Sequence, residues 1–110
     1  MDGLPAAEDA VVCGPVWISP LQMCELRIKG RRVRTSVTLL HMLAFLIKAD
    51  GRVVPREELD GGSAKRASSS RRVDVQIFRI RRVLGPYGKF LISVPGHGYR
   101  VDVFGLSQAR

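Results

Sequence analysis

The chain has 110 residues, 45% of them apolar and 25% charged, which is enough for one globular domain with a modest core that needs no metal or disulfide. Its formal net charge of +8 and a pI near 10.5 favour a polyanionic partner, with nucleic acid ahead of an anionic membrane surface. No apolar run reaches the length of a transmembrane helix, and the acidic start is not a signal peptide. We therefore expect a cytoplasmic location and no membrane partner.

The cysteines and histidines give no metal-binding pattern. Cys13 and Cys24 are too few for a zinc site, and neither histidine lies at ligand spacing from them. The two cysteines could meet across neighbouring strands, but a cytoplasmic location favours the reduced state. His41 lies inside an apolar helical pattern and is expected to be a partly buried side chain. We predict no metal and no cofactor.

The first third of the chain predicts a leader and a small sheet. Residues 1–10 have the composition of a flexible leader. Residues 11–35 contain short extended runs separated by Gly- and Pro-containing turns, which predicts an antiparallel sheet. Alternation in the third run predicts a strand with one face in water, in which Glu25 and Arg27 are exposed and the inward side chains are Cys24, Leu26 and Ile28.

Residues 36–84 predict three helices. Ser36 can cap the first, which runs to about Lys48 and should be the central core helix because of its broad apolar face: Leu39, Leu40, Leu43, Leu46 and Ile47. Pro55 opens a short second helix with acidic residues in its first turn. A basic low-complexity loop over residues 61–70 follows, and Ser70 is the candidate N-cap of a third helix that ends at Leu84.

The third helix combines one apolar stripe with one basic face. Helical spacing places Val73, Ile77, Ile80 and Leu84 on one side, and on the other Arg72, Val75, Gln76, Arg79 and Arg82. Residues 61–100 hold nine Lys and Arg against Asp74 alone, a balance equal to the net charge of the whole chain. Arginine matches guanine edges and phosphates, and glutamine can bridge the edge of adenine. This concentration of charge favours nucleic acid over an ordinary solvated face.

Residues 90–104 predict a hairpin of two strands joined at Pro95-Gly96-His97-Gly98, and residues 105–110 a tail. The predicted fold class is therefore α+β. An N-terminal antiparallel sheet, three helices of which the third is basic, and a C-terminal β-hairpin wing form a winged helix-turn-helix, with the folded domain over residues 11–104.

Three segments, in this order and at this spacing, carry a resemblance to a known family. They are Gly51-Arg-Val-Val-Pro-Arg-Glu-Glu-Leu59, the basic helix at 71–85, and Ile92-Ser-Val-Pro-Gly-His-Gly-Tyr-Arg100. From about residue 16 to residue 103 the sequence resembles the OmpR/PhoB-type DNA-binding domain of bacterial transcription regulators. The resemblance implies sequence-specific binding of double-stranded DNA, with helix 71–84 in the major groove and wing 93–100 at the minor groove or backbone.

The family's contact positions map onto named residues of this chain. On the recognition helix they are Arg71, Arg72, Val75, Gln76, Arg79, Arg81 and Arg82. Further candidate DNA-binding residues on the wing and in the loop are Ser93, His97, Arg100, Lys65 and Arg66. Arg79 is the best candidate for a base contact, Val75 for a thymine methyl group, and Arg71, Arg72 and Arg82 for phosphates. Helical periodicity turns Arg81 away from Arg79. Asp74, in the first turn, should offset the helix dipole and pair with an arginine.

The chain departs from the family pattern at several points. Leu39 stands where a glutamate usually completes a capping box. The segment after the second helix is short and has Asp60-Gly-Gly-Ser in place of a tryptophan-containing continuation, in the region that often contacts RNA polymerase in response regulators. Pro95 replaces a common minor-groove arginine. The wing is more similar to that of one-component regulators, in which the position of His97 is commonly arginine.

The sequence also allows functions other than sequence-specific DNA binding. The main alternative is a protein-interaction module that docks RNA polymerase or another regulator through the same basic face. RNA is a poorer fit because aromatic residues are few, and an enzyme is not expected because no catalytic constellation or P-loop is present. Further candidate partners are RNA polymerase and a second copy of the chain on tandem half-sites. The expectation is a protein that acts alone or forms one half of a larger regulator.

Overall fold

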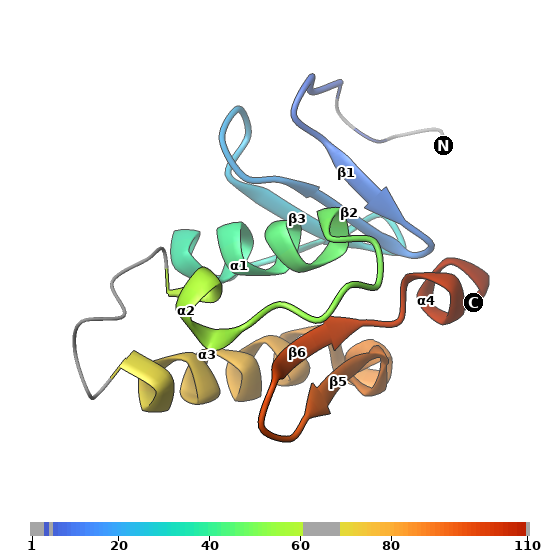
Figure 1. Ribbon diagram of the computed structural model, residues 1–110. Coiled ribbons are helices and arrows are strands. Elements are labelled where there is room, and N and C mark those ends of the chain that lie inside the picture. Colours follow the sequence, from blue (N-terminus) through green and yellow to red (C-terminus); the bar gives the residue numbers. More distant parts are fainter. Residues whose placement is uncertain (1–3, 5, 61–68, 110) are drawn as a thin grey trace.

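The computed structural model of the chain describes residue 4 and residues 6–60 and 69–109. A four-stranded antiparallel sheet comes first, then the helices, then a two-stranded hairpin and a last short helix (Figure 1). The elements are β1 Val11–Cys13, β2 Val16–Ser19, β3 Glu25–Ile28, β4 Arg31–Val33, α1 Val37–Lys48, α2 Arg56–Leu59, α3 Ser69–Leu84, the 3₁₀ helix η1 Gly85–Phe90, β5 Leu91–Val94, β6 Gly98–Val101 and α4 Val103–Gln108. The predicted α+β winged helix-turn-helix is confirmed.

The N-terminal sheet has the strand order β1-β2-β3-β4, with each strand antiparallel to the next. The alternation predicted for β3 is wrong at two residues. Cys24 precedes the strand with a φ of 49° and is exposed, whereas Glu25 is buried. Arg27 Nε donates a hydrogen bond to Glu25 Oε2, and Arg32 forms an ion pair with Glu25 Oε1 at 3.3 Å. Both oxygens of the buried carboxylate are thus paired with a cation, which offsets the free-energy cost of removing the charge from water.

The end of the predicted leader is anchored to this sheet. The Asp9 carboxylate accepts hydrogen bonds from the Ser19 hydroxyl at 2.6 Å and from the backbone N–H groups of Leu21 and Gln22. These hydrogen bonds, of which the one from Ser19 has the largest effect, hold the pKa of Asp9 below its ordinary value. Desolvation acts in the opposite direction but does not outweigh them. Asp9 therefore fastens the residues before β1 to the turn after β2.

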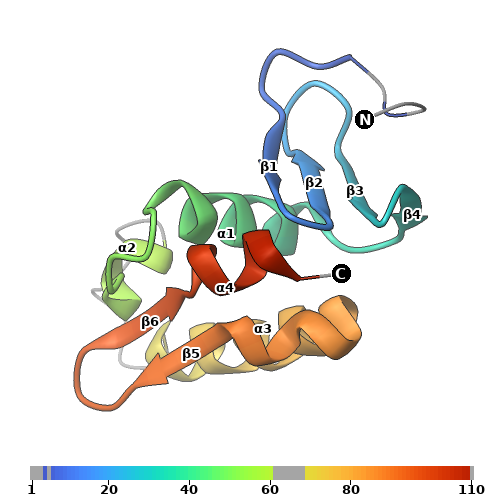
Figure 2. The ribbon, with the colours of Figure 1, turned by 90° about the vertical axis from the view of Figure 1, so that its right-hand side faces the viewer.

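Helix α1 is the central core helix, as predicted. It lies between the sheet and α3 (Figures 1 and 2), and every residue of its predicted apolar face is buried. The Ser36 hydroxyl accepts a hydrogen bond from the Leu39 N–H at 3.2 Å, so the predicted N-cap is confirmed. The prediction for His41 is wrong: its side chain is exposed because residue 41 lies on the helix face opposite the core.

Helix α3 buries its predicted stripe, since Val73, Ile77, Ile80 and Leu84 are all at most 2% exposed. The predicted N-cap is wrong, because α3 begins at Ser69 and includes Ser70. The predicted loop contacts Lys65 and Arg66 lie outside the described residues.

The wing hairpin is held against the rest of the domain through Tyr99. Its N–H and carbonyl group exchange hydrogen bonds with Val54, in the connection between α1 and α2, at 3.0 and 2.7 Å. Gly98 has a φ of 142°, and a Cβ there would lie 2.1 Å from the Val54 carbonyl oxygen. Only glycine allows this close approach of the two backbones.

The end of the chain differs from its prediction. The second wing strand was expected to reach Phe104, but β6 ends at Val101, and α4 replaces both the end of the strand and most of the predicted tail. Asp102 explains the change, because its carboxylate accepts a hydrogen bond from the Gly105 N–H at 3.0 Å and caps the new helix.

In the part of the chain that the structure describes, no helix has the combination of length and apolarity that crossing a membrane requires.

Candidate nucleic-acid interface

One face of α3 points away from the core. Figure 1 shows α3 at the edge of the molecule with α1 on its inner side and no other described element across its outer side. Six residues on this side are exposed, and they are called the outer face of α3 below: Arg71, Arg72, Val75, Phe78, Arg79 and Arg82. Five of them were predicted as contact residues, and their exposure agrees with the helical periodicity of the sequence.

The outer face carries four arginines with unopposed charge. Among residues 6–60 and 69–109, none of Arg71, Arg72, Arg79 and Arg82 forms an ion pair or a hydrogen bond. Asp74, the sole acidic residue of α3, is paired with Arg56 of α2. The guanidinium groups are therefore available to a polyanion.

Gln76 is less accessible than its predicted role required. It is half-buried on the flank of α3, and its Oε1 atom is buried without a hydrogen-bond partner among the described residues. Helix geometry explains this position. At about 100° per residue, Gln76 lies closer around the helix to Ile77 of the buried stripe than Arg79 does. The arginines therefore dominate the outer face.

Arg81 is turned toward the wing. Its Nε and Nη2 atoms donate to the Leu91 carbonyl oxygen at 3.1 and 2.8 Å, and Nη2 also donates to the Ser93 hydroxyl at 2.9 Å. Two predicted contact residues, Arg81 and Ser93, are thus bonded to each other. This geometry joins α3 to the first strand of the wing, and it agrees with the helical periodicity that separated Arg81 from Arg79.

Asp74 joins three elements. It accepts hydrogen bonds from the Tyr99 hydroxyl in β6 and from Arg56 Nε in α2 at 2.9 Å, and the Arg56 guanidinium lies 5.3 Å from the centre of the Tyr99 ring. The predicted pairing of Asp74 with an arginine is confirmed. The bond to Tyr99 was not predicted, because the two residues are 25 positions apart and meet only through the register of the hairpin.

This cluster of Arg56, Asp74 and Tyr99 shifts all three pKa values. Partial burial raises the pKa of Asp74, but the hydrogen bonds from Tyr99 and Arg56 outweigh it and leave the pKa below its ordinary value. Burial, and then the bond to Asp74, raise the pKa of Tyr99, and the bond to Asp74 raises that of Arg56. At neutral pH the cluster holds one carboxylate, one guanidinium and one neutral phenol.

The wing presents His97 at its tip. His97 is exposed, and its backbone N–H donates to the Val94 carbonyl oxygen at 3.0 Å, which closes the turn that includes Pro95 and Gly96. Arg100, also predicted as a contact, is half-buried, and its Nε donates to the Gly51 carbonyl oxygen at 3.0 Å. Of the three predicted wing residues, the structure therefore leaves only the His97 side chain without an intramolecular hydrogen bond among the described residues.

Phe78 is an outer-face residue that the sequence analysis missed. Its ring is 59% exposed, and the Arg82 guanidinium lies 5.9 Å from its centre. The helical angle of position 78, one turn from both Val75 and Arg82, was the signal that could have identified it.

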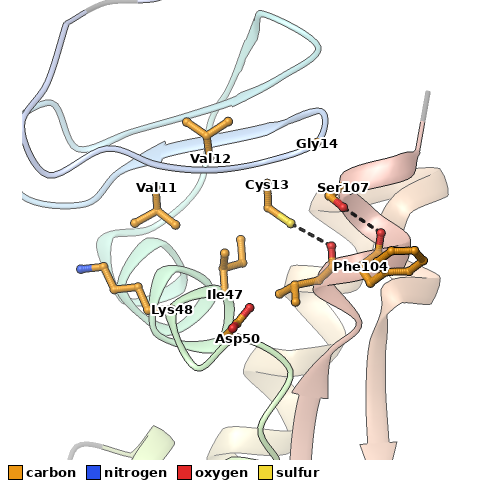
Figure 3. A pocket seen from close by; sticks show the side chains of 10 residues that line it. Val11, Val12, Cys13, Gly14, Ile47, Lys48, Asp50, Phe104 and Ser107 are labelled. Atoms are coloured by element: carbon orange, nitrogen blue, oxygen red, sulfur yellow. Dashed lines mark hydrogen bonds between the residues drawn. The ribbon is translucent and has the colours of Figure 1, made fainter.

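A hollow of about 680 Å³ lies elsewhere, between β1, the end of α1 and α4 (Figure 3). The Cys13 thiol donates to the Val103 carbonyl oxygen at 3.4 Å at its edge, and burial raises the pKa of that thiol. Lys48 and Asp50 are its charged lining residues, so the hollow lacks the cationic character of the outer face. Cys13 and Cys24 are both free, and no group of three or more metal-ligating side chains occurs in the described ranges.

Known structures with this fold include several DNA-binding domains. The domain of response regulator AdeR, in complex with an intercistronic region, is 24% identical, with a TM-score of 0.72 over 84% of this chain and 98% of that one. The domain of RstA from Klebsiella pneumoniae, in complex with the RstA box, is 25% identical, with a TM-score of 0.70 over 86% and 97%. The domain of CadC from E. coli is 24% identical, with a TM-score of 0.72 over 89% and 95%.

Sequence comparison places the chain in a family. Curated protein sequences give no significant match. The family model described as "Transcriptional regulatory protein, C terminal" matches residues 30–101, from the end of the N-terminal sheet to the last residue of the wing. Because this match includes α1, α2, α3 and both wing strands, the chain belongs to the family of C-terminal domains of transcriptional regulatory proteins, the OmpR/PhoB type.

Proposed function

We propose that this domain binds double-stranded DNA in a sequence-specific manner and acts in transcription regulation. The observation that carries the proposal is the outer face of α3, where four arginines without an ion-pair partner among the described residues surround two exposed apolar side chains. Cations match the phosphates on both sides of a groove, and an α-helix fits the width of the major groove of B-DNA. Helix α3 is therefore the recognition helix in this proposal.

The outer-face residues take different roles according to their position on α3. Arg79 lies in mid-helix and is proposed to contact a base edge, where arginine pairs with guanine. Arg71 and Arg72 at the start and Arg82 near the end lie where a helix in the groove passes the sugar-phosphate strands, so they are proposed to contact phosphates. Gln76, half-buried at the flank, is proposed as a secondary contact.

Arg81, Ser93 and Arg100 are proposed to position the wing instead of binding DNA. Their polar groups are engaged within the domain, Arg81 with Ser93 and Arg100 with Gly51. A wing held in this way would bring His97 to the minor groove or backbone when α3 enters the major groove. Lys65 and Arg66, in the segment that precedes α3, remain predicted DNA contacts.

The similar structures support DNA as the partner. RstA is 25% identical to this chain and was solved in complex with the RstA box, and AdeR, which shares the fold, was solved with an intercistronic region. The family is one of transcriptional regulatory proteins, not of enzymes, so we infer that the domain has no catalytic activity. A cytoplasmic location, contact with RNA polymerase and pairing of two copies on tandem half-sites complete the proposal.

Random-site selection tests this function directly. The purified domain is mixed with a duplex library containing a randomised window, and bound molecules are amplified and sequenced over several rounds. We expect one common site, or two copies at a fixed spacing, to be enriched. Absence of enrichment over the starting library would overturn the proposal, and capture of an acidic protein through the same face would then favour an interaction module.

A matched pair of variants makes the selection specific to α3. Replacing Arg79 and Arg82 with alanine removes two positive charges from the outer face. Replacing Arg31, in β4, and Arg34, just after β4, removes two exposed charges from the N-terminal sheet region. Both double variants have the same net charge. We expect enrichment to be lost in the first and kept in the second.

A further inference from the structure

Phe78 is an exposed aromatic side chain that the core does not need. The four inward residues of α3 are buried without it, and its ring is 59% exposed. Val75, one helical turn earlier, is 44% exposed on the same side. These two side chains form a small apolar surface, the Val75–Phe78 step, among the four arginines of the outer face of α3.

The surroundings of this step determine what can cover it. The arginines of the outer face flank it, and the Arg82 guanidinium lies 5.9 Å from the Phe78 ring centre. Burying these four cations against an apolar protein surface or in a bilayer interior would carry a large desolvation cost. A partner that supplies both anionic groups and apolar groups at close range avoids that cost, because the charges are paired while the step is covered.

The major groove of DNA is a surface of this kind. Phosphates line its two sides, and the thymine C5-methyl group is the apolar group that its base edges present. The rise of about 1.5 Å per residue separates positions 75 and 78 by about 4.5 Å along α3. The base pairs of B-DNA are about 3.4 Å apart along the helix axis, so the two side chains can face neighbouring base pairs.

Resting on the proposed function, we propose that Phe78 is a specificity-determining residue that packs against a thymine methyl group in the major groove. Val75 contacts the methyl group of a neighbouring thymine. The Phe78 ring has a second role, since stacking holds the Arg82 guanidinium over it in position for a phosphate. The domain therefore prefers sites with thymine at these positions through contacts that require no hydrogen bond.

Replacing thymine by uracil tests this inference, because it removes one methyl group and leaves the base-pairing groups in place. Starting from the selected site, each thymine facing α3 is replaced singly by deoxyuridine, and affinity is measured by fluorescence anisotropy. For the wild-type domain we expect about fourfold weaker binding at the position that Phe78 contacts, as the loss of one buried methyl group predicts. For Phe78→Ala, thymine and uracil at that position should bind equally well.

Three control variants separate this contact from other effects of the ring. Phe78→Leu keeps an apolar side chain and should keep most of the preference for thymine. Phe104→Ala removes an exposed phenylalanine, 75% accessible on α4, and should behave as the wild type. Val75→Ala should lose the preference at the neighbouring thymine and keep that due to Phe78. Because Phe78 is exposed, Phe78→Ala should fold normally, which circular dichroism verifies.

The outcomes distinguish failure of this inference from failure of the proposed function. If selection returns no site, the function fails, and this inference fails with it. If a site is found but contains no thymine facing α3, or if Phe78→Ala keeps the wild-type ratio of thymine to uracil affinity, DNA binding stands and the inference is overturned. The inference is also overturned if Phe78→Ala weakens binding equally to the thymine and uracil duplexes and flattens the dependence of affinity on salt. Phe78 would then act only through Arg82.

Discussion

The Tyr99 hydroxyl donates a hydrogen bond to the Asp74 carboxylate, and this bond joins wing strand β6 to the first half of α3. Arg56 of α2 donates to the same carboxylate and stacks over the Tyr99 ring. The proposed DNA contacts lie on α3 and on the wing tip. The position of the wing relative to α3 therefore depends on the cluster of Arg56, Asp74 and Tyr99, which is not part of the outer face of α3.

Tyr99→Phe removes the hydroxyl group from this cluster and keeps the ring. We expect the free energy of unfolding to fall by about 1 kcal/mol, since a net hydrogen bond is worth about 0.5–1.5 kcal/mol and the Asp74 side chain is close to half exposed. Urea unfolding followed by circular dichroism measures the change. Tyr87→Phe, at a buried tyrosine with no hydroxyl hydrogen bond in the described part of the chain, is the control and should cost less. Equal losses in the two variants would contradict the assignment.

The interactions of Asp74 with Tyr99 and Arg56 should weaken in acid. The pKa of Asp74 is lowered in the folded state, so its contribution to stability is fully present above the unfolded value of about 3.9 and is lost as pH falls through the folded value. We expect the difference in unfolding free energy between wild type and Asp74→Asn to be constant from pH 7 to about pH 5 and to shrink below about pH 4. Asp9, whose pKa is also lowered, is present in both proteins and cancels in the difference. A difference independent of pH would show that the charge of Asp74 is not involved.

Arg79→Ala should affect the selected site more than other DNA. Loss of a contact with a guanine edge is expected to cost about 1–3 kcal/mol on the selected duplex and to reduce the discrimination at one base pair. Anisotropy titrations against the selected and a shuffled duplex measure both effects. Arg34→Ala, at an exposed arginine just after β4, controls for the change in net charge. An equal loss on both duplexes would mean that Arg79 contacts only phosphate.

Arg81 and Arg82 are neighbours with opposite expected behaviour. Arg82→Ala should reduce the slope of log affinity against log salt by about 0.9, as expected for one lost phosphate contact, and leave stability nearly unchanged. Arg81→Ala should leave the slope unchanged and lower the unfolding free energy by about 1 kcal/mol, because it loses its hydrogen bonds to Leu91 and Ser93. Salt titrations and urea unfolding separate the two effects. The reverse result would show that Arg81 contacts DNA and Arg82 does not.

Local patterns predicted most of the fold. The buried stripe of α3, the broad apolar face of α1 and the Ser36 cap follow from spacing and from the chemistry of a helix terminus, and both helices form as expected. Residue Asp102 carried a similar local signal for α4. The apolar residues after it fit the end of a strand equally well, so the sequence alone does not distinguish the two structures.

The candidate site could be predicted only in part, because several of its contacts join residues distant in the sequence. Periodicity identified the outer face of α3 and separated Arg81 from Arg79, but the partner of Arg81 depends on where β5 packs. The Tyr99–Asp74 bond depends in the same way on the hairpin register. Glu25 is buried because two arginines of the sheet pair with it, and alternation alone could not indicate this.

Amide chemical-shift mapping tests the central claim most directly. The ¹⁵N-labelled domain is titrated with the selected duplex, and shift changes are mapped onto the described residues. We predict the largest changes along the outer face of α3, at Arg71, Arg72, Val75, Phe78, Arg79 and Arg82, with a second group at the wing tip around His97 and little change in β1–β4. Changes concentrated on the N-terminal sheet or around the hollow near Cys13, with α3 unaffected, would contradict the assignment of α3 as the DNA-binding helix.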